Sequence, residues 1–177
     1  MNDQLRYSVP DGDFYSFLLG SWKRNLTWKE FGGSFSSLKT SNTVIVVEEK
    51  RDAAAEPNTR FLNWKMGSSL NEERLRLEMC MQFIPDETGV THLEWLYKGH
   101  VCHGTFQPES SSAAMVFVSP TGTTQTCYHV VDQNTMSVCV VQVDNRHPPT
   151  IQYGIMYRIS PSDYDHTTLE EDEDLDS

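Results

Sequence analysis

The sequence has few basic residues and no long apolar run. Its 14 lysines and arginines stand against 25 aspartates and glutamates, which gives a formal net charge of -11. Proteins bind a phosphate backbone through a clustered basic surface, so we expect no nucleic-acid partner. No apolar run approaches the roughly 20 residues that a membrane-spanning helix needs, so we also expect no membrane span.

Cysteine is scarce, and the familiar catalytic motifs are missing. The four cysteines, at positions 80, 102, 127 and 139, form no CxxC pair. We expect them to be reduced thiols in a reducing compartment, either the cytoplasm or a plastid if a transit peptide precedes this sequence. The sequence has no nucleophile elbow, Walker loop, dinucleotide-binding fingerprint or zincin motif, which argues against a serine or cysteine hydrolase. The histidines and cysteine of residues 92–103 have no standard zinc spacing, so no metal site is expected.

The acidic residues are concentrated at the C-terminus. Between Leu169 and Asp176 the chain has six acids and no base. Runs of this kind are usually solvated, so we expect residues 162–177 to form a disordered tail. Residues 1–161 should then form a single domain, with residues 1–12 as a loosely held arm.

Between these ends, apolar and polar residues alternate in one short segment after another. Such alternation is typical of strands with one buried face. About ten segments at spacings of roughly 8–12 residues indicate a β-sandwich or a barrel. The predicted strands are 21–28, 34–38, 43–50, 60–66, 74–84, 90–98, 100–106, 113–118, 123–131, 136–143 and 150–159. A short helix over residues 14–19 is expected before them, with Asp13 as its N-cap and Gly20 at its end.

The junction of this helix with the first strand carries the most informative motif. Phe14-Tyr15 is followed by Gly20-Ser21-Trp22, and this opening resembles that of calycin (lipocalin-like) barrels, where a short helix leads into G-x-W. The resemblance implies an all-β, ten-stranded, antiparallel up-and-down barrel with Trp22 plugging its closed end. In lipocalins an arginine of the last strand packs over this tryptophan, and Arg158 is the corresponding residue here.

Within the calycins, the S-type phycobiliprotein chromophore lyases are the most similar in layout. Their F-F-x4-G-x-W opening resembles residues 14–22, and a Y-H-x-D stretch in their later strands resembles Tyr128-His129 before Asp132. Their first strand has an arginine four residues after the tryptophan and then a His-His pair. Here Leu26 stands at that spacing, no histidine pair follows, and Arg24 comes earlier. The resemblance implies a bilin (an open-chain tetrapyrrole) as ligand, no covalently bound cofactor, and an acceptor apo-phycobiliprotein whose cysteine receives the bilin.

Strand alternation supplies the candidate site residues. Arg24 shares a face with Trp22, so it points inward if Trp22 does. A buried arginine needs an anionic partner, and the candidates are Asp144, Glu94 and a ligand carboxylate. Asp144 and Glu94 are also the candidate catalytic acids beside the pyrrole nitrogens. The other predicted ligand contacts are Trp28, Trp64, Met66, Trp95, Gln142 and Arg146.

Three other functional hypotheses remain open at this point. The first is a non-catalytic carrier of a fatty acid, an isoprenoid or haem. Fatty-acid-binding proteins share a G-x-W-K opening but are shorter, and nitrobindin-like haem barrels have a histidine near the C-terminal end, which residues 150–159 lack. The second is a small barrel enzyme for a hydrophobic substrate, and the third is an interaction module whose barrel is filled by side chains.

Overall fold

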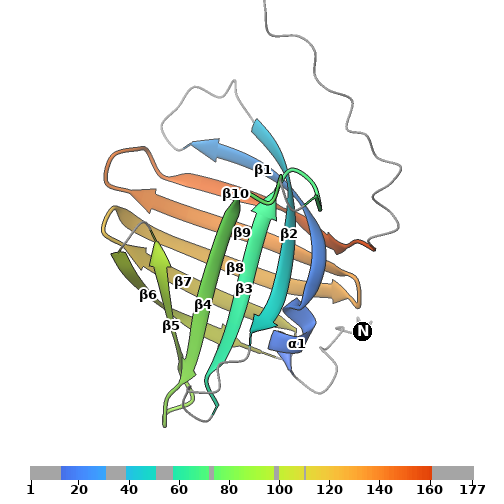
Figure 1. Cartoon of the computed structure of the whole chain (residues 1–177). Coiled ribbons are helices and arrows are strands. Elements are labelled where there is room, and N and C mark those ends of the chain that lie inside the picture. The colour runs from blue at the N-terminus through green and yellow to red at the C-terminus, as the bar shows by residue number, and fades with distance from the viewer. Residues whose placement is uncertain are drawn as a thin grey trace, which may run out of the picture.

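Ten antiparallel strands close into a barrel in the computed structural model of the chain (Figure 1). The structure describes residues 13–30, 39–50, 58–71, 74–97, 100–109 and 111–160. Each strand pairs with the next along the chain, and the tenth pairs with the first. The strands are β1 (Gly20–Glu30), β2 (Lys39–Lys50), β3 (Arg60–Gly67), β4 (Leu77–Pro85), β5 (Thr91–Tyr97), β6 (His100–Pro108), β7 (Ser112–Ser119), β8 (Gly122–Asp132), β9 (Thr135–Asp144) and β10 (Thr150–Arg158). The predicted all-β, ten-stranded, up-and-down barrel with a short N-terminal helix is therefore confirmed.

The helix α1 (Phe14–Leu18) lies at one end of the barrel, which we call the closed end. Asp13 caps it as expected, because its carboxylate accepts hydrogen bonds from the backbone N–H groups of Tyr15 and Ser16 at 3.1 and 3.2 Å. Phe14, Phe17 and Leu18 are buried against the strands. The apolar face of the helix therefore fills the barrel end instead of covering its side.

Trp22 and Arg158 form the expected stacked pair beneath this helix. Trp22 is fully buried, and its indole N–H donates to the carbonyl oxygen of Leu18 at 2.8 Å. The Arg158 guanidinium lies 4.3 Å from the centre of the indole ring and donates to the carbonyl oxygens of Leu19 and Phe17. The partly buried arginine thus satisfies carbonyl groups at the end of the helix, where an α-helix leaves its last carbonyl groups without intrahelical partners.

Gly20 makes this close approach possible. Its φ is +117°, a conformation that L side chains rarely adopt. A Cβ at this position would also lie 3.0 Å from Nη1 of Arg158. The glycine of the G-x-W motif is therefore required both for the turn and for the stacked pair.

One predicted strand boundary differs from the structure, and other predictions lie outside the described residues. Residues 74–76 do not belong to β4, because Arg74 and Leu75 donate their backbone N–H groups to the carbonyl oxygen of Asn71 in a turn. The predicted strand 34–38, the N-terminal arm and the acidic tail are not among the residues that the structure describes. In the described ranges, no helix is long and apolar enough to cross a membrane.

Candidate functional site

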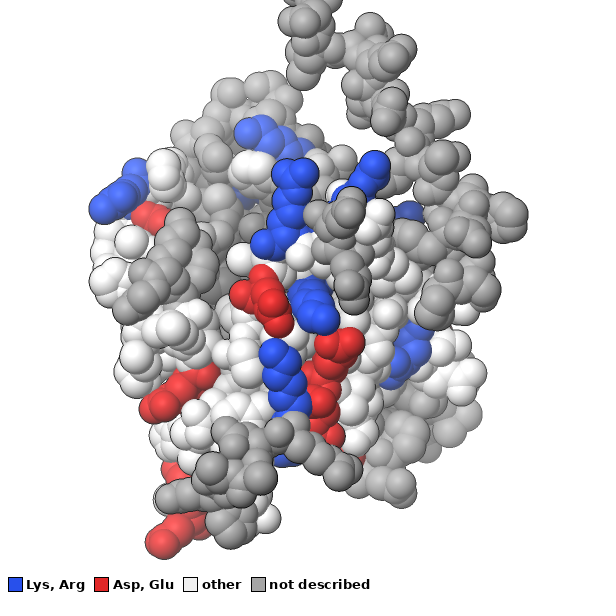
Figure 2. Space-filling view, in the orientation of Figure 1, with Lys and Arg blue, Asp and Glu red and all other residues white. Residues whose placement is uncertain are grey.

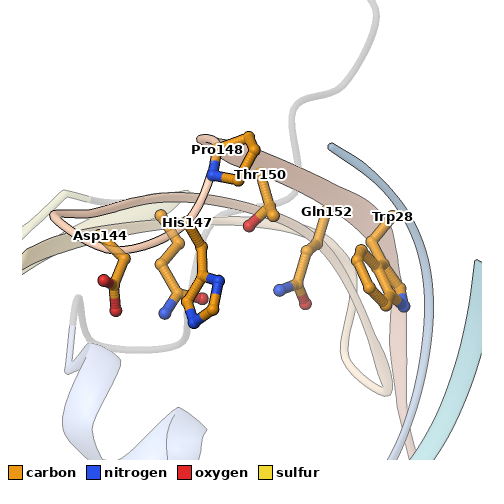
Figure 3. A pocket seen from close by; sticks show the side chains of 7 residues that line it. Trp28, Asp144, His147, Pro148, Thr150 and Gln152 are labelled. Carbon is orange, nitrogen blue, oxygen red and sulfur yellow. The ribbon is translucent and has the colours of Figure 1, made fainter. Parts of the chain in front are cut away.

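A pocket of about 230 Å³ lies at the end of the barrel opposite α1, which we call the mouth. Its wall comes from the last part of β1, the last part of β9, the β9–β10 connection and the start of β10. The lining residues are Trp28, Gln142, Asp144, His147, Pro148, Thr150 and Gln152. Figure 3 shows the polar side chains of Asp144, His147 and Gln152 pointing into the pocket, with the indole of Trp28 beside Gln152.

The strand register explains why these residues meet. Directly opposite residues of an antiparallel pair point to the same side of the sheet. Trp28 lies opposite Gln152, and Thr150 lies opposite Gln142. The Thr150 hydroxyl is buried and has no hydrogen-bond partner, so a polar atom is available at the wall of the pocket.

Arg24 lies deeper in the barrel on the same face of β1. Trp22 and Leu26, two residues before and after it, are 0% and 2% exposed, and its partner on β10 is the buried Met156. Its Nε atom is buried and has no hydrogen-bond partner. Among the described carboxylates, none forms an ion pair with Arg24. The predicted inward direction is therefore seen, whereas the predicted pairing with Asp144 or Glu94 is not.

The ionisable group that acts on Arg24 is Tyr128 of β8. Burial raises the pKa of Tyr128 to about 12, although the nearby Arg24 charge lowers it in part. Burial lowers the pKa of Arg24, and Tyr128 opposes this effect. At neutral pH a phenol with such a pKa stays protonated, so Tyr128 does not neutralise the guanidinium. The barrel therefore holds a poorly compensated cation, which an anionic group of a ligand would stabilise.

The inner wall formed by β3, β4, β5 and β7 is aromatic and sulfur-rich. Trp64, which is 4% exposed, pairs with Met79 across β3 and β4, and its indole N–H is buried without an acceptor. Trp95 packs edge-on against Phe117, with 5.0 Å between ring centres. Met66 lies on the same inward face as Trp64, two residues further toward the mouth. This wall offers flat apolar surface together with one unsatisfied donor.

The structure corrects the hypothesis for Glu94 and weakens that for Arg146. Glu94 lies between the inward-facing Leu93 and Trp95, and its side chain is 44% exposed on the outer surface, 3.6 Å from His103. It therefore cannot reach a ligand inside the barrel. Arg146 is exposed in the β9–β10 connection and is not part of the pocket wall.

Asp144 does line the pocket, and it helps to shape the loop beside it. Its carboxylate accepts the backbone N–H of Arg146 at 2.7 Å. In the part of the chain that the structure describes, no group of three histidines, cysteines or acids is placed to hold a metal ion.

The sequence did not indicate five residues that contribute to the pocket or to the surroundings of Arg24. They are His147, Pro148, Thr150 and Gln152 of the pocket wall and Tyr128 beside Arg24. Alternation from Trp28 through its cross-strand partner could have found Gln152 and Thr150, because both share the face of Trp28. His147 lies in a loop, where no periodicity indicates a direction.

Comparison with known proteins adds a likeness in fold. No protein-family model matches this sequence, and no curated protein sequence matches it. The solved structure of the S-type phycobiliprotein lyase CPES from Guillardia theta is similar, with a TM-score of 0.63 and 14% sequence identity. The matched region covers 88% of this chain and 94% of the lyase. The chain therefore has the fold of an S-type lyase barrel, in agreement with the resemblance in its sequence.

Proposed function

We propose that the barrel binds an elongated, largely apolar ligand with carboxylate groups, and that this ligand is a bilin. In this proposal the protein delivers the bilin to a cysteine of an acceptor phycobiliprotein. The observation that carries it is the inward-facing Arg24, whose Nε atom is buried without a partner. The likeness to a phycobiliprotein lyase supports the choice of a bilin over other apolar acids.

Arg24 would recognise a propionate group of the ligand. A guanidinium binds a carboxylate through two parallel hydrogen bonds, and burial strengthens their electrostatic part. A charge-assisted contact of this kind contributes about 1.5–3 kcal/mol, which is roughly a 10- to 150-fold gain in affinity. A ligand carboxylate would also remove the penalty of the uncompensated cation, so binding and barrel stability should increase together.

The aromatic wall would hold the conjugated part of the ligand. Flat rings gain both apolar burial and ring-to-ring contacts against Trp28, Trp64 and Trp95, and the flexible Met66 can adapt to their shape. The buried N–H of Trp64 needs an acceptor. A carbonyl oxygen of the ligand would provide one, whereas a hydrocarbon chain would leave the donor unsatisfied.

Attachment of the ligand would take place at the mouth. The thiol of the acceptor protein adds across a carbon–carbon double bond of the bilin, so that a carbon–sulfur bond forms and the ligand takes up a proton. Asp144, which lines the mouth pocket, would carry that proton. The barrel itself would contribute mainly the position of the ligand relative to the incoming thiol.

A binding panel tests the proposal. Biliverdin, haem and palmitic acid are each titrated into the protein, and ligand absorbance and tryptophan fluorescence are recorded. A red-shifted, sharpened biliverdin band with fluorescence quenching is the expected result. Quenching by palmitic acid alone would replace the bilin with a fatty acid, and no response to any ligand would indicate a barrel filled by its own side chains.

Two variants show whether Arg24 is the contact. Arg24→Gln should weaken biliverdin binding by roughly 10- to 150-fold. Lys23→Gln is the matched control, because Lys23 carries the same charge on the same strand but points to the other side. Equal losses in both variants would show that overall charge, and not the inward guanidinium, determines affinity.

A further inference from the structure

The outer surface of the barrel is divided into a charged part and an uncharged part. Figure 2 shows basic and acidic side chains interleaved on the face formed by β2, β3 and β4. Ion pairs on this face include Lys50–Glu78 at 3.5 Å and Lys65–Glu48 at 3.1 Å. By contrast, residues 123–131, 135–143 and 151–157 of β8, β9 and β10 include no Lys, Arg, Asp or Glu.

The uncharged part has a ridge beside a trough. Tyr153 and Ile155 of β10 form the ridge, with exposures of 52% and 50%. Their cross-strand neighbours on β9 are the small residues Cys139 and Ser137, and Cys139 in turn lies opposite Cys127 of β8. These small side chains line the trough, which is a mainly apolar groove of about 680 Å³ on the outside of the barrel.

We propose that this ridge and trough form the interface between two copies of the chain. In a two-fold symmetric dimer the same patch occurs on both sides, so a ridge must find a trough in the identical surface. Here the ridge and the trough lie on adjacent strands. A rotation by half a turn therefore places Tyr153 and Ile155 of one copy over the small side chains of β9 and β8 in the other.

The charge distribution favours this face for self-association. With a net charge of -11, two copies repel one another when charged surfaces approach. Contact through β8, β9 and β10 brings no lysine, arginine, aspartate or glutamate of these segments into the interface. The charged face over β2 to β4 can then stay in solvent, so no charge has to be buried without a partner.

The size of the patch indicates a weak dimer. Strands lie about 4.8 Å apart and rise about 3.3 Å per residue, so these three strands cover about 14 by 33 Å. Two such patches together hide about 1,000 Å² in projection, which is the lower limit for a specific interface. Association should therefore depend on protein concentration.

Sedimentation velocity over protein concentrations from about 1 to about 300 µM tests the dimer. Wild-type protein should shift from monomer to dimer across this range. Ile155→Asp should raise the dissociation constant about tenfold or more, because a carboxylate would be buried in the interface. Leu96→Asp is the matched control, since Leu96 is an equally apolar outer residue on β5 with 67% exposure, and it should dimerise like wild type. A wild-type protein that stays monomeric, or equal effects of both variants, would overturn the proposal.

Thiol labelling gives an independent readout that needs no substitution. Cys127 and Cys139 lie in the trough, whereas the exposed Cys80 lies on β4. Iodoacetamide labelling followed by mass spectrometry should show both trough cysteines protected at high protein concentration, with Cys80 unaffected. Protection that does not change with concentration would contradict the dimer. This result is separate from the proposed function, because the ligand contacts lie inside the barrel.

Discussion

The two arginines on the inward face of the barrel should respond in opposite ways when each is replaced by methionine. Arg158 is satisfied, because it stacks on Trp22 and donates to three backbone carbonyl groups. Arg24 is not, because its Nε atom is buried without a partner. Methionine keeps the apolar stem of either side chain and removes the charge, so the comparison isolates the guanidinium.

The expected magnitudes follow from these contacts. Replacing a buried ion pair by well-packed apolar groups is often neutral or stabilises proteins by about 1–4 kcal/mol. We expect a gain in the lower half of this range for Arg24→Met, because Arg24 is only partly buried. Such a gain raises Tm by about 2–8 °C in a chain of this size. Arg158→Met loses three charge-assisted hydrogen bonds and the cation–π contacts with Phe17 and Trp22, so it should cost about 3 kcal/mol or more.

Thermal and urea unfolding, followed by near-ultraviolet circular dichroism without ligand, measure both effects. With saturating biliverdin the advantage of Arg24→Met over the wild type in Tm should shrink or reverse, because the ligand stabilises the wild type more than it stabilises Arg24→Met. At a concentration 100 times the dissociation constant this stabilisation is about 2.7 kcal/mol. If Arg24→Met destabilises the unliganded protein as much as Arg158→Met, then Arg24 is a structural residue and the argument for a ligand carboxylate fails.

Three further predictions concern the closed end, the barrel interior and the C-terminal tail. Gly20→Ala should cost about 1–3 kcal/mol in urea unfolding, because the positive φ is strained for alanine and the new Cβ crowds Arg158; an unchanged midpoint would mean that the turn relaxes freely. Tyr128 has a pKa raised from 10.0 to about 12, so its contribution to stability is complete below pH 10 and is lost as pH rises toward 12. Tyr128→Phe should reduce this alkaline loss of stability, and phenol absorbance should show one fewer late-ionising tyrosine in this variant than in the wild type. Deleting residues 162–177 should shift Tm by only about a degree or two, because so acidic a segment lacks the apolar surface to offset its ordering entropy; a large drop would show that the acids contribute to the fold.

Much of the fold could be predicted because alternation and motif agree along the chain. The G-x-W opening predicted both the buried Trp22 and its stacking with Arg158 across the closing β1–β10 pair. The same alternation predicted that Arg24 points inward. It also implied that Glu94 points outward, because Glu94 stands between the apolar residues Leu93 and Trp95. The hypothesis for Glu94 did not take this alternation into account.

Other parts of the site could not be predicted, for reasons that lie in the local sequence. In β8 the segment from Thr123 to Val131 has small, weakly polar residues on both faces, so alternation does not show that Tyr128 is the inward one. The loop containing His147 has no period. At Arg74 a turn closed on Asn71 overrides the alternating pattern, because its backbone hydrogen bonds replace those of a strand.

The central claim is that the barrel binds a carboxylate-bearing apolar ligand through an inward-facing cation. The most direct test compares the affinity of the wild-type protein for biliverdin with that for biliverdin dimethyl ester by fluorescence titration. The two ligands share their rings and differ only in the carboxylates, so the free acid should bind roughly 10- to 150-fold more tightly. Equal affinity for acid and ester, or no binding of either, would contradict the account.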